Sequence, residues 1–203
     1  MFIDIAFAED NETDFLEMAA RLGTEALCFS PGKRIVGTYS AGPKPRNADI
    51  VIIRSGPKDR DVMERMKPDI IYDLEYSTDA DSLHFRSSGL NQVLCKIAKE
   101  KKVMVGISFS SLLAARDRPQ AMGRIMQNIR LCRKYGVDMV IASFARDPYQ
   151  LRAEKDLLAL CHTLGMEPGQ AKRAVNSVSE RISYNKKRKD PDFIMDGLEI
   201  VHQ

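Results

Sequence analysis

Short apolar runs alternate with stretches of helical periodicity along most of the 203-residue chain. A run of four to eight apolar residues between turn residues is typical of a buried strand, whereas apolar residues at i, i+3, i+4 and i+7 indicate an amphipathic helix. The apolar runs predict about seven strands, at Phe2–Phe7, Ala26–Phe29, Ile35–Tyr39, Asp49–Ile53, Ile70–Tyr72, Val103–Ile107 and Met139–Ala142. The periodic stretches predict helices at Glu12–Leu22, Val62–Met66, Leu90–Ala98, Pro119–Tyr135, Leu157–Leu164 and from Pro168 onward.

This order of elements predicts the fold class. Repeated βα units with short links favour parallel strands covered by helices on the outside. We therefore expect an α/β protein, a TIM-barrel-like (β/α) barrel that forms a single domain over residues 1–185. Residues 186–203, which begin with the basic run Lys186–Lys189, are expected to form a C-terminal tail. An open doubly wound sheet is the alternative architecture, and neither fold determines a function.

The distribution of charge is more informative than the formal net charge of +3. Residues 1–30 contain seven acids and one base, whereas residues 86–134 contain eleven lysines and arginines and only two acids. A chain that is nearly neutral overall can therefore carry one strongly positive face. Such a face suits a polyanion such as RNA or DNA, although a solvated helical surface would show the same charges.

Several classes of protein are disfavoured by what the sequence lacks. The four cysteines form no C-x-x-C pair, which argues against a zinc knuckle or a redox motif and predicts buried, reduced thiols. No apolar run approaches the roughly 18 residues needed to cross a bilayer. The first eight residues lack the basic region of a signal peptide. We therefore expect a cytoplasmic chain with no membrane partner.

A barrel enzyme would carry its chemistry at the carboxyl ends of the strands. The residues predicted there include no histidine; they are Ala8, Glu9, Ser30, Arg54, Ser55, Asp73, Ser108 and Ser143. There is also no P-loop, G-x-S-x-G or G-x-G-x-x-G motif. We therefore expect no catalytic residue and no metal ligand in this chain. The alternative is a metal-dependent barrel phosphoesterase acting on a small substrate, with Asp4, Asp73 and Arg54 as its candidate residues.

Two segments carry a family resemblance. Residues 89–113 read GLNQVLCKIAKEKKVMVGISFSSLL and residues 151–175 read LRAEKDLLALCHTLGMEPGQAKRAV. In this order and at this spacing they resemble ribonuclease P protein component 3, the archaeal relative of the thirty-kilodalton human subunit. Asn91–Lys96 corresponds to the start of a family helix, and Leu151-Arg152 and Asp156-Leu157 match its Leu-Arg and Asp-Leu pairs. Ser110 departs from the pattern, because some members have a basic residue there.

The resemblance implies a TIM-barrel-like fold, related to a phosphoesterase superfamily, that has lost its metal ligands. It also implies a subunit of the ribonucleoprotein endonuclease that removes the 5′ leader from precursor tRNA in tRNA processing. The RNA subunit would perform the hydrolysis and hold the Mg²⁺ ions, so that this chain binds no cofactor of its own. The implied partners are ribonuclease P RNA and protein component 2, with precursor tRNA contacted only indirectly.

Folded RNA is bound mainly through its phosphates and its shape, so exposed lysines and arginines are the expected contacts. The candidates for RNA binding are Arg86, Lys96, Arg116, Arg118, Arg152 and Lys155. Arg152 has a competing role, because it could pair with Asp156 four residues later on the same helix. A third possibility is a structural scaffold that contacts only other proteins.

Overall fold

The computed structural model describes residues 2–29, 48–78, 80–195 and 198–199. Its parallel strands are β1 (Ile3–Ala6), β2 (Ala26–Phe29), β3 (Ile52–Arg54), β4 (Ile70–Tyr72), β5 (Met104–Ser108) and β6 (Met139–Ala142). The helices are α1 (Glu12–Leu22), α2 (Asp59–Asp61), α3 (Gln92–Lys101), α4 (Phe109–Ala114), α5 (Arg118–Tyr135), α6 (Glu154–Thr163) and α7 (Pro168–Lys187). Short helical turns occur at η1 (Val62–Met66), η2 (Leu74–Tyr76) and η3 (Pro148–Gln150), and the antiparallel pair β7 (Phe193–Met195) and β8 (Leu198–Glu199) follows α7.

The order of the strands is that of a barrel. Strands β3, β4, β5 and β6 pair in parallel in sequence order, and β1 pairs in parallel with β2. A parallel bridge between Ala6 and Ala145 joins the two sheets, because Phe7 N–H donates to Ala145 O and Ala145 N–H donates to Ile5 O. The row therefore runs β3-β4-β5-β6-β1-β2. The first strand of the chain, β1, thus lies beside β6 and continues the row. An open doubly wound sheet would instead reverse direction at a switch point, so the TIM-barrel-like fold is confirmed.

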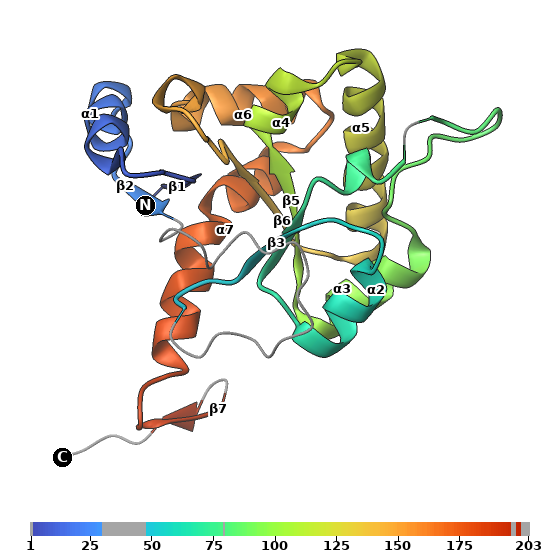
Figure 1. The fold of residues 1–203 in the computed structure, drawn as a ribbon. Helices are drawn as coiled ribbons and strands as arrows, with labels where there is room; N and C mark the ends of the chain where they lie inside the picture. Colours follow the sequence, from blue (N-terminus) through green and yellow to red (C-terminus); the bar gives the residue numbers. More distant parts are fainter. Residues whose placement is uncertain (1, 30–47, 79, 196–197, 200–203) are drawn as a thin grey trace.

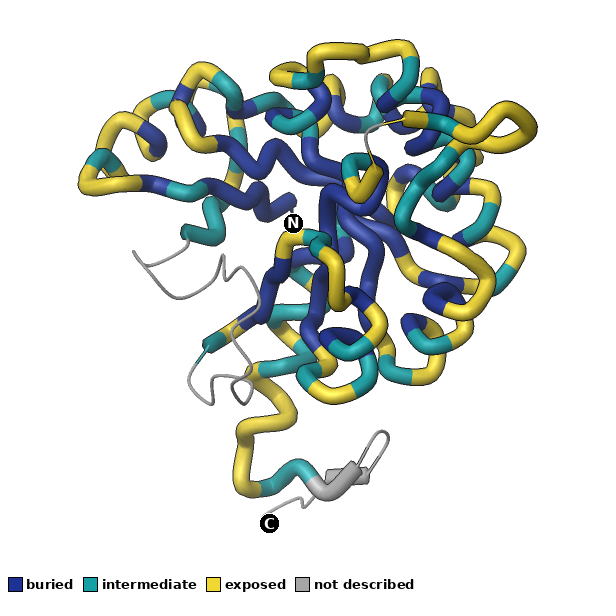
Figure 2. Tube along the Cα trace, turned by 45° about the vertical axis from the view of Figure 1, so that its right-hand side comes forward, coloured by how far each residue is buried: buried dark blue, intermediate teal, exposed yellow. Residues whose placement is uncertain are grey.

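Two apolar layers form the core, one inside the row of strands and one between the strands and the helices. Figure 1 shows the helices arranged around the central strands. Side chains of a strand alternate between its two faces, so Ile70 and Tyr72 face the interior whereas Ile71 packs in the outer layer. Gly106 is required at the interior, since a Cβ there would lie 2.9 Å from Tyr72 Cβ. Figure 2 shows the result, with buried strands at the centre and exposed residues on the outer helices.

The boundaries expected from the sequence agree with the structure for most elements. The strand expected from Asp49 begins only at Ile52, and α4 was not expected at all. Helix α7 continues to Lys187, past the expected domain end at residue 185. The expected strand Ile35–Tyr39 and the loop after it lie outside the described residues. Within the described ranges, no helix is both long and apolar enough to span a membrane.

Candidate functional site

The carboxyl ends of the strands bring several polar side chains together, as the sequence predicts. Arg54 is the last residue of β3, Asp73 follows β4, and Ser108 ends β5. The Arg54 Nε atom donates to Asp73 Oδ2 over 2.8 Å, and Ser111 Oγ donates to the same oxygen over 3.0 Å. Asp73 also has φ of 66°, in the left-handed region that residues other than glycine rarely adopt. The β3–β4 end is therefore held in one defined arrangement around a buried carboxylate.

A second buried carboxyl group lies near Asp73. Glu75, in η2, is 1% exposed, and its Oε1 atom has no hydrogen-bond partner among the described residues. Burial raises the pKa of Glu75 to about 8, with a further contribution from the negative charge of Asp73. Burial also raises the pKa of Asp73, while the bond from Ser111 and the charge of Arg54 oppose that shift. Glu75 is thus protonated at neutral pH, which lets the two carboxyl groups lie close together.

Asp4 has a structural role and joins the two sheets. Its Oδ1 atom accepts from Ile5 N–H over 2.9 Å and from Ser143 N–H over 2.6 Å, which ties β1 to the end of β6. Burial raises the pKa of Asp4 to about 6 even though these bonds lower it. No group of three or more potential metal ligands is found among the residues that the structure describes. Asp4 and Asp73 each accept hydrogen bonds from protein groups, which gives both carboxylates a structural role.

Three arginines line a pocket at this end of the barrel, which we call the mouth pocket. It has a volume of about 350 Å³ and is bounded by Arg54, Arg116 and Arg146 together with Tyr76, Ser110, Ser111, Ala114, Ala115 and Gln150. The two serine hydroxyls are occupied, since Ser110 donates to Phe144 O and Ser111 to Asp73. The Tyr76 hydroxyl is buried and has no partner among the described residues. The mouth pocket therefore offers positive charge.

The predicted RNA-binding residues occupy several different places. Arg116 lines the mouth pocket, and the nearby Arg118 is exposed and donates to Leu113 O. Arg152 donates to the carbonyls of Tyr149 and Leu151, and its guanidinium lies 4.6 Å from the ring centre of Phe109. These contacts take the place of the pairing with Asp156 that the sequence left open.

The other three candidates lie apart from the mouth pocket. Arg86 packs against α5, where it donates to Gly123 O over 3.2 Å, and a Cβ on Gly123 would lie 2.7 Å from its Nε atom. Lys96 is exposed in the middle of α3, and Lys155 is exposed in the first turn of α6. Whether any of the six residues contacts RNA stays a prediction.

Two arginines for which the sequence predicted no role have defined positions at this end of the barrel. Arg146 lines the mouth pocket, and its position just beyond β6 was the only available signal. Arg124 was counted in the basic stretch but is only 2% exposed. It donates to Asp81 over 2.7 Å and to the carbonyls of Glu75 and Thr78, so it braces the chain that follows β4. Arg124 therefore contributes to the fold and not to a positive surface.

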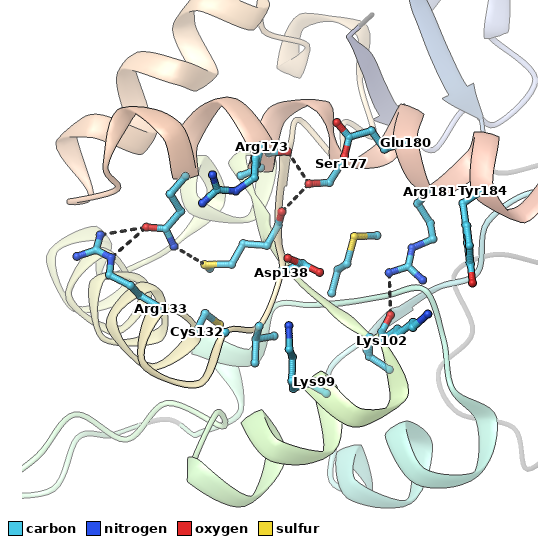
Figure 3. A pocket seen from close by; sticks show the side chains of 18 of the residues that line it. Lys99, Lys102, Cys132, Arg133, Asp138, Arg173, Ser177, Glu180, Arg181 and Tyr184 are labelled. Carbon is cyan, nitrogen blue, oxygen red and sulfur yellow. Dashed lines mark hydrogen bonds between the residues drawn. The ribbon is translucent and has the colours of Figure 1, made fainter. Parts of the chain in front are cut away.

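A second hollow lies at the amino ends of β5 and β6, and we call it the amino-end groove (Figure 3). It has a volume of about 590 Å³ between α3, α5 and α7, and its charged residues are Lys99, Lys102, Arg133, Arg173, Arg181, Asp138, Glu167 and Glu180. Arg133 donates to Gly165 O and to Gln170 Oε1, and Arg181 donates to Lys102 O over 2.8 Å. Its cations are accordingly mixed with acids, and two of them are held by the protein itself.

Comparison with known proteins identifies the family. The family model described as RNase P subunit p30 matches residues 42–190. Ribonuclease P protein component 3 of Methanosarcina acetivorans is 34% identical over 184 residues, covering 88% of this chain and 72% of that protein. The counterpart from Methanosarcina mazei is 32% identical over 185 residues, with the same two coverages.

The structural comparison gives the same fold. A chain in the cryo-EM structure of archaeal ribonuclease P with mature tRNA superposes with a TM-score of 0.64 and 21% identity, and the match covers 99% of this chain and 98% of that one. These matches favour the ribonuclease P interpretation of the sequence over the metal-dependent phosphoesterase. The chain belongs to the RNase P subunit p30 family.

Proposed function

We propose that the chain is a protein subunit of ribonuclease P that binds the RNA subunit and stabilises its active fold during removal of the 5′ leader from precursor tRNA. The observation that carries this proposal is the family match over residues 42–190, together with relatives named ribonuclease P protein component 3. The RNA subunit would be the catalyst, and the Mg²⁺ ions of the reaction would be held by RNA. Protein component 2 is the proposed protein partner.

The carboxyl end of the barrel supports the RNA-binding part of the proposal. Arg116 is exposed in the connection between α4 and α5, and Arg118 is exposed as the first residue of α5. Arg152 lies beside α4 through its contact with Phe109. Guanidinium groups suit phosphates because their planar fork can donate two hydrogen bonds to one phosphate. Neutralising closely spaced RNA phosphates is also how a protein lowers the Mg²⁺ that a folded RNA requires.

A reconstitution experiment tests this function. The triple variant Arg116→Glu/Arg118→Glu/Arg152→Glu should raise the Mg²⁺ concentration needed for half-maximal precursor-tRNA cleavage roughly twofold or more, because it replaces attraction to RNA phosphates with repulsion. The enzyme is assembled from its RNA, the variant chain and the remaining protein subunits, and cleavage is measured across a Mg²⁺ titration.

The matched control is Arg21→Glu/Arg130→Glu/Lys172→Glu, which makes the same change in charge at exposed positions away from the mouth pocket. The control should retain the Mg²⁺ dependence of the unaltered chain. Equal Mg²⁺ dependence for all three assemblies would contradict the proposed RNA contact at the carboxyl end. Phosphoester hydrolysis by the purified chain without RNA would instead support the alternative function, a metal-dependent phosphoesterase.

A further inference from the structure

The mouth pocket has more positive charge than the acids around it offset. Its lining contains three arginines and no acid. Asp73 beside it forms an ion pair with Arg54, and the charges of Arg54 and Arg146 both oppose the rise in its pKa. Among the described residues, no acid lies within ion-pair distance of the Arg116 or Arg146 guanidinium.

The acids next to these arginines in the sequence make hydrogen bonds elsewhere. The Asp117 side chain caps α5 by accepting from Gln120 N–H, and the Asp147 side chain caps η3 by accepting from Tyr149 N–H. Each carboxylate therefore stabilises the start of a helical segment. The Arg116 and Arg146 charges are therefore left for a ligand, apart from the weaker interaction of Arg146 with Asp73.

The pocket is also built to hold its ligand in a defined position. Arg54 is fixed through its Nε atom by the buried Asp73, which leaves its terminal nitrogens as further donors. A tetrahedral anion with several acceptor oxygens suits the guanidinium donors that line the pocket from three separate segments of the chain. A volume of about 350 Å³ admits such a group with its attached sugar or substituent.

We propose that the mouth pocket binds one phosphoryl group, with Arg116 and Arg146 as its main ligands and Arg54 beside them. If the proposed function holds, on which this assignment of source rests, the phosphoryl group is a backbone phosphate of RNA. Arg116 and Arg146 are exposed at the rim, so a phosphate that belongs to a polymer can reach them. A free phosphorylated molecule is the other source of the same chemistry.

The first test uses the full chain and inorganic phosphate. Arginine side-chain NMR signals are followed while phosphate is added at constant ionic strength. The Nε–Hε signals of Arg54, Arg116 and Arg146 should shift together and saturate, whereas that of the exposed Arg130 should stay in place. Chloride at the same ionic strength is the control for unspecific screening. Shifts of equal size at Arg130, or no saturable shift at the three arginines, would overturn the phosphoryl site.

The second test separates the two sources. The variant Arg116→Ala/Arg146→Ala is compared with the control Arg130→Ala/Lys172→Ala for binding to ribonuclease P RNA. The mouth variant should bind roughly tenfold more weakly, with the slope of log K against log salt reduced by about one, because one phosphate contact is lost. The control should change neither quantity by as much. The variant Arg116→Lys/Arg146→Lys should recover part of the affinity, because it keeps the charge but loses the fork.

The outcomes distinguish this proposal from the proposed function. Phosphate binding that is lost in the mouth variant, together with RNA binding that matches the control, would assign the pocket to a free phosphorylated molecule and overturn the RNA source. If the unaltered chain binds phosphate but neither binds RNA nor lowers the Mg²⁺ requirement of the reconstituted enzyme, the proposed function fails while the phosphoryl site stands.

Discussion

The two ends of the barrel both carry clustered cations, but they use them differently. In the amino-end groove, Arg133 and Arg181 donate hydrogen bonds to carbonyl and amide oxygens, and three acids line the same hollow. At the carboxyl end, Arg116 and Arg146 line a pocket without an acid in its lining. The sequence shows that both regions contain cations, but it does not show which groups lie beside each of them. What separates them is whether the protein has already satisfied each cation, and this difference makes the mouth pocket the better candidate for a polyanion.

Burial adds a second contrast, because the carboxyl end keeps more ionisable groups inside the protein. Asp73, Glu75 and Arg124 are each no more than 2% exposed. At the amino end Asp69 is also buried, but Asp138 and Glu180 of the amino-end groove are exposed. Buried charged or acidic groups are costly unless they are paired, hydrogen-bonded or neutralised. The carboxyl end is therefore the region where single substitutions should have the largest effects on stability.

Arg124 should give the largest of these effects. The substitution Arg124→Met removes the guanidinium that donates to Asp81 and to the Glu75 and Thr78 carbonyls, so the two carbonyls and the Asp81 carboxylate lose a donor. We expect the free energy of unfolding to fall by about 2 kcal/mol, because Arg124 is buried and its loss leaves buried carbonyl groups without a donor. Urea denaturation followed by circular dichroism measures the change.

Arg130→Met is the matched control, because Arg130 is exposed on the same helix. It should change the free energy of unfolding by no more than about 0.5 kcal/mol. Similar losses for the two variants would mean that Arg124 does not brace the segment after β4.

Glu75 should make stability depend on pH in the opposite direction from an ordinary paired carboxylate. Its folded-state pKa of about 8 exceeds the ordinary value of 4.5, so the folded chain holds the proton more tightly than the unfolded chain. The contribution of Glu75 to the free energy of unfolding is fully present below pH 4.5, and it is lost as pH rises from 4.5 through about 8. The free energy of unfolding should then fall by about 2 kcal/mol between pH 6 and pH 8.

The substitution Glu75→Gln should remove most of this loss, because a neutral amide does not titrate. Glu180→Gln, at an exposed acid of the amino-end groove, should leave the pH dependence of the unaltered chain in place. Denaturation curves at pH 6, 7 and 8 for the unaltered chain and the two variants measure this pH dependence of the free energy of unfolding. A Glu75→Gln variant that still loses the full amount would place the titrating group elsewhere.

The sequence predicted the βα order because each strand is a short apolar run and each helix has a clear apolar stripe. It also placed Arg54 and Asp73 together, since the carboxyl ends of parallel strands meet at one edge. Helix α4 was missed because it has only six residues, which is too short for periodicity to be visible. Its one local signal is Ser108, whose side chain accepts from Ser111 N–H as an N-cap.

The positions of individual arginines could not be predicted, and the reason is geometric. Arg146 reaches the mouth pocket only because Ala145 bridges to Ala6, a pairing between segments 139 residues apart in the chain. Arg124 lies within the basic stretch yet turns inward, toward Asp81 and the carbonyls after β4. Charge patterns report the number of cations, whereas burial depends on contacts that only the folded chain makes.

The smallest expected effect tests the comparison between the two ends directly. Arg181 has a side chain only 14% exposed, donates to Lys102 O over 2.8 Å and lies 3.8 Å from the Asp69 carboxylate, which itself accepts from Val51 N–H. Arg181→Ala should lower the free energy of unfolding by about 1 kcal/mol, because it leaves these acceptors with fewer donors. Arg146→Ala should cost no more than about 0.5 kcal/mol, since the exposed Arg146 forms no ion pair among the described residues.

The two variants should also respond differently to phosphate buffer. Phosphate should stabilise the Arg181→Ala variant as much as it stabilises the unaltered chain, and it should stabilise the Arg146→Ala variant less. Equal costs for the two substitutions, with equal stabilisation by phosphate, would show that the two ends hold their arginines in the same way.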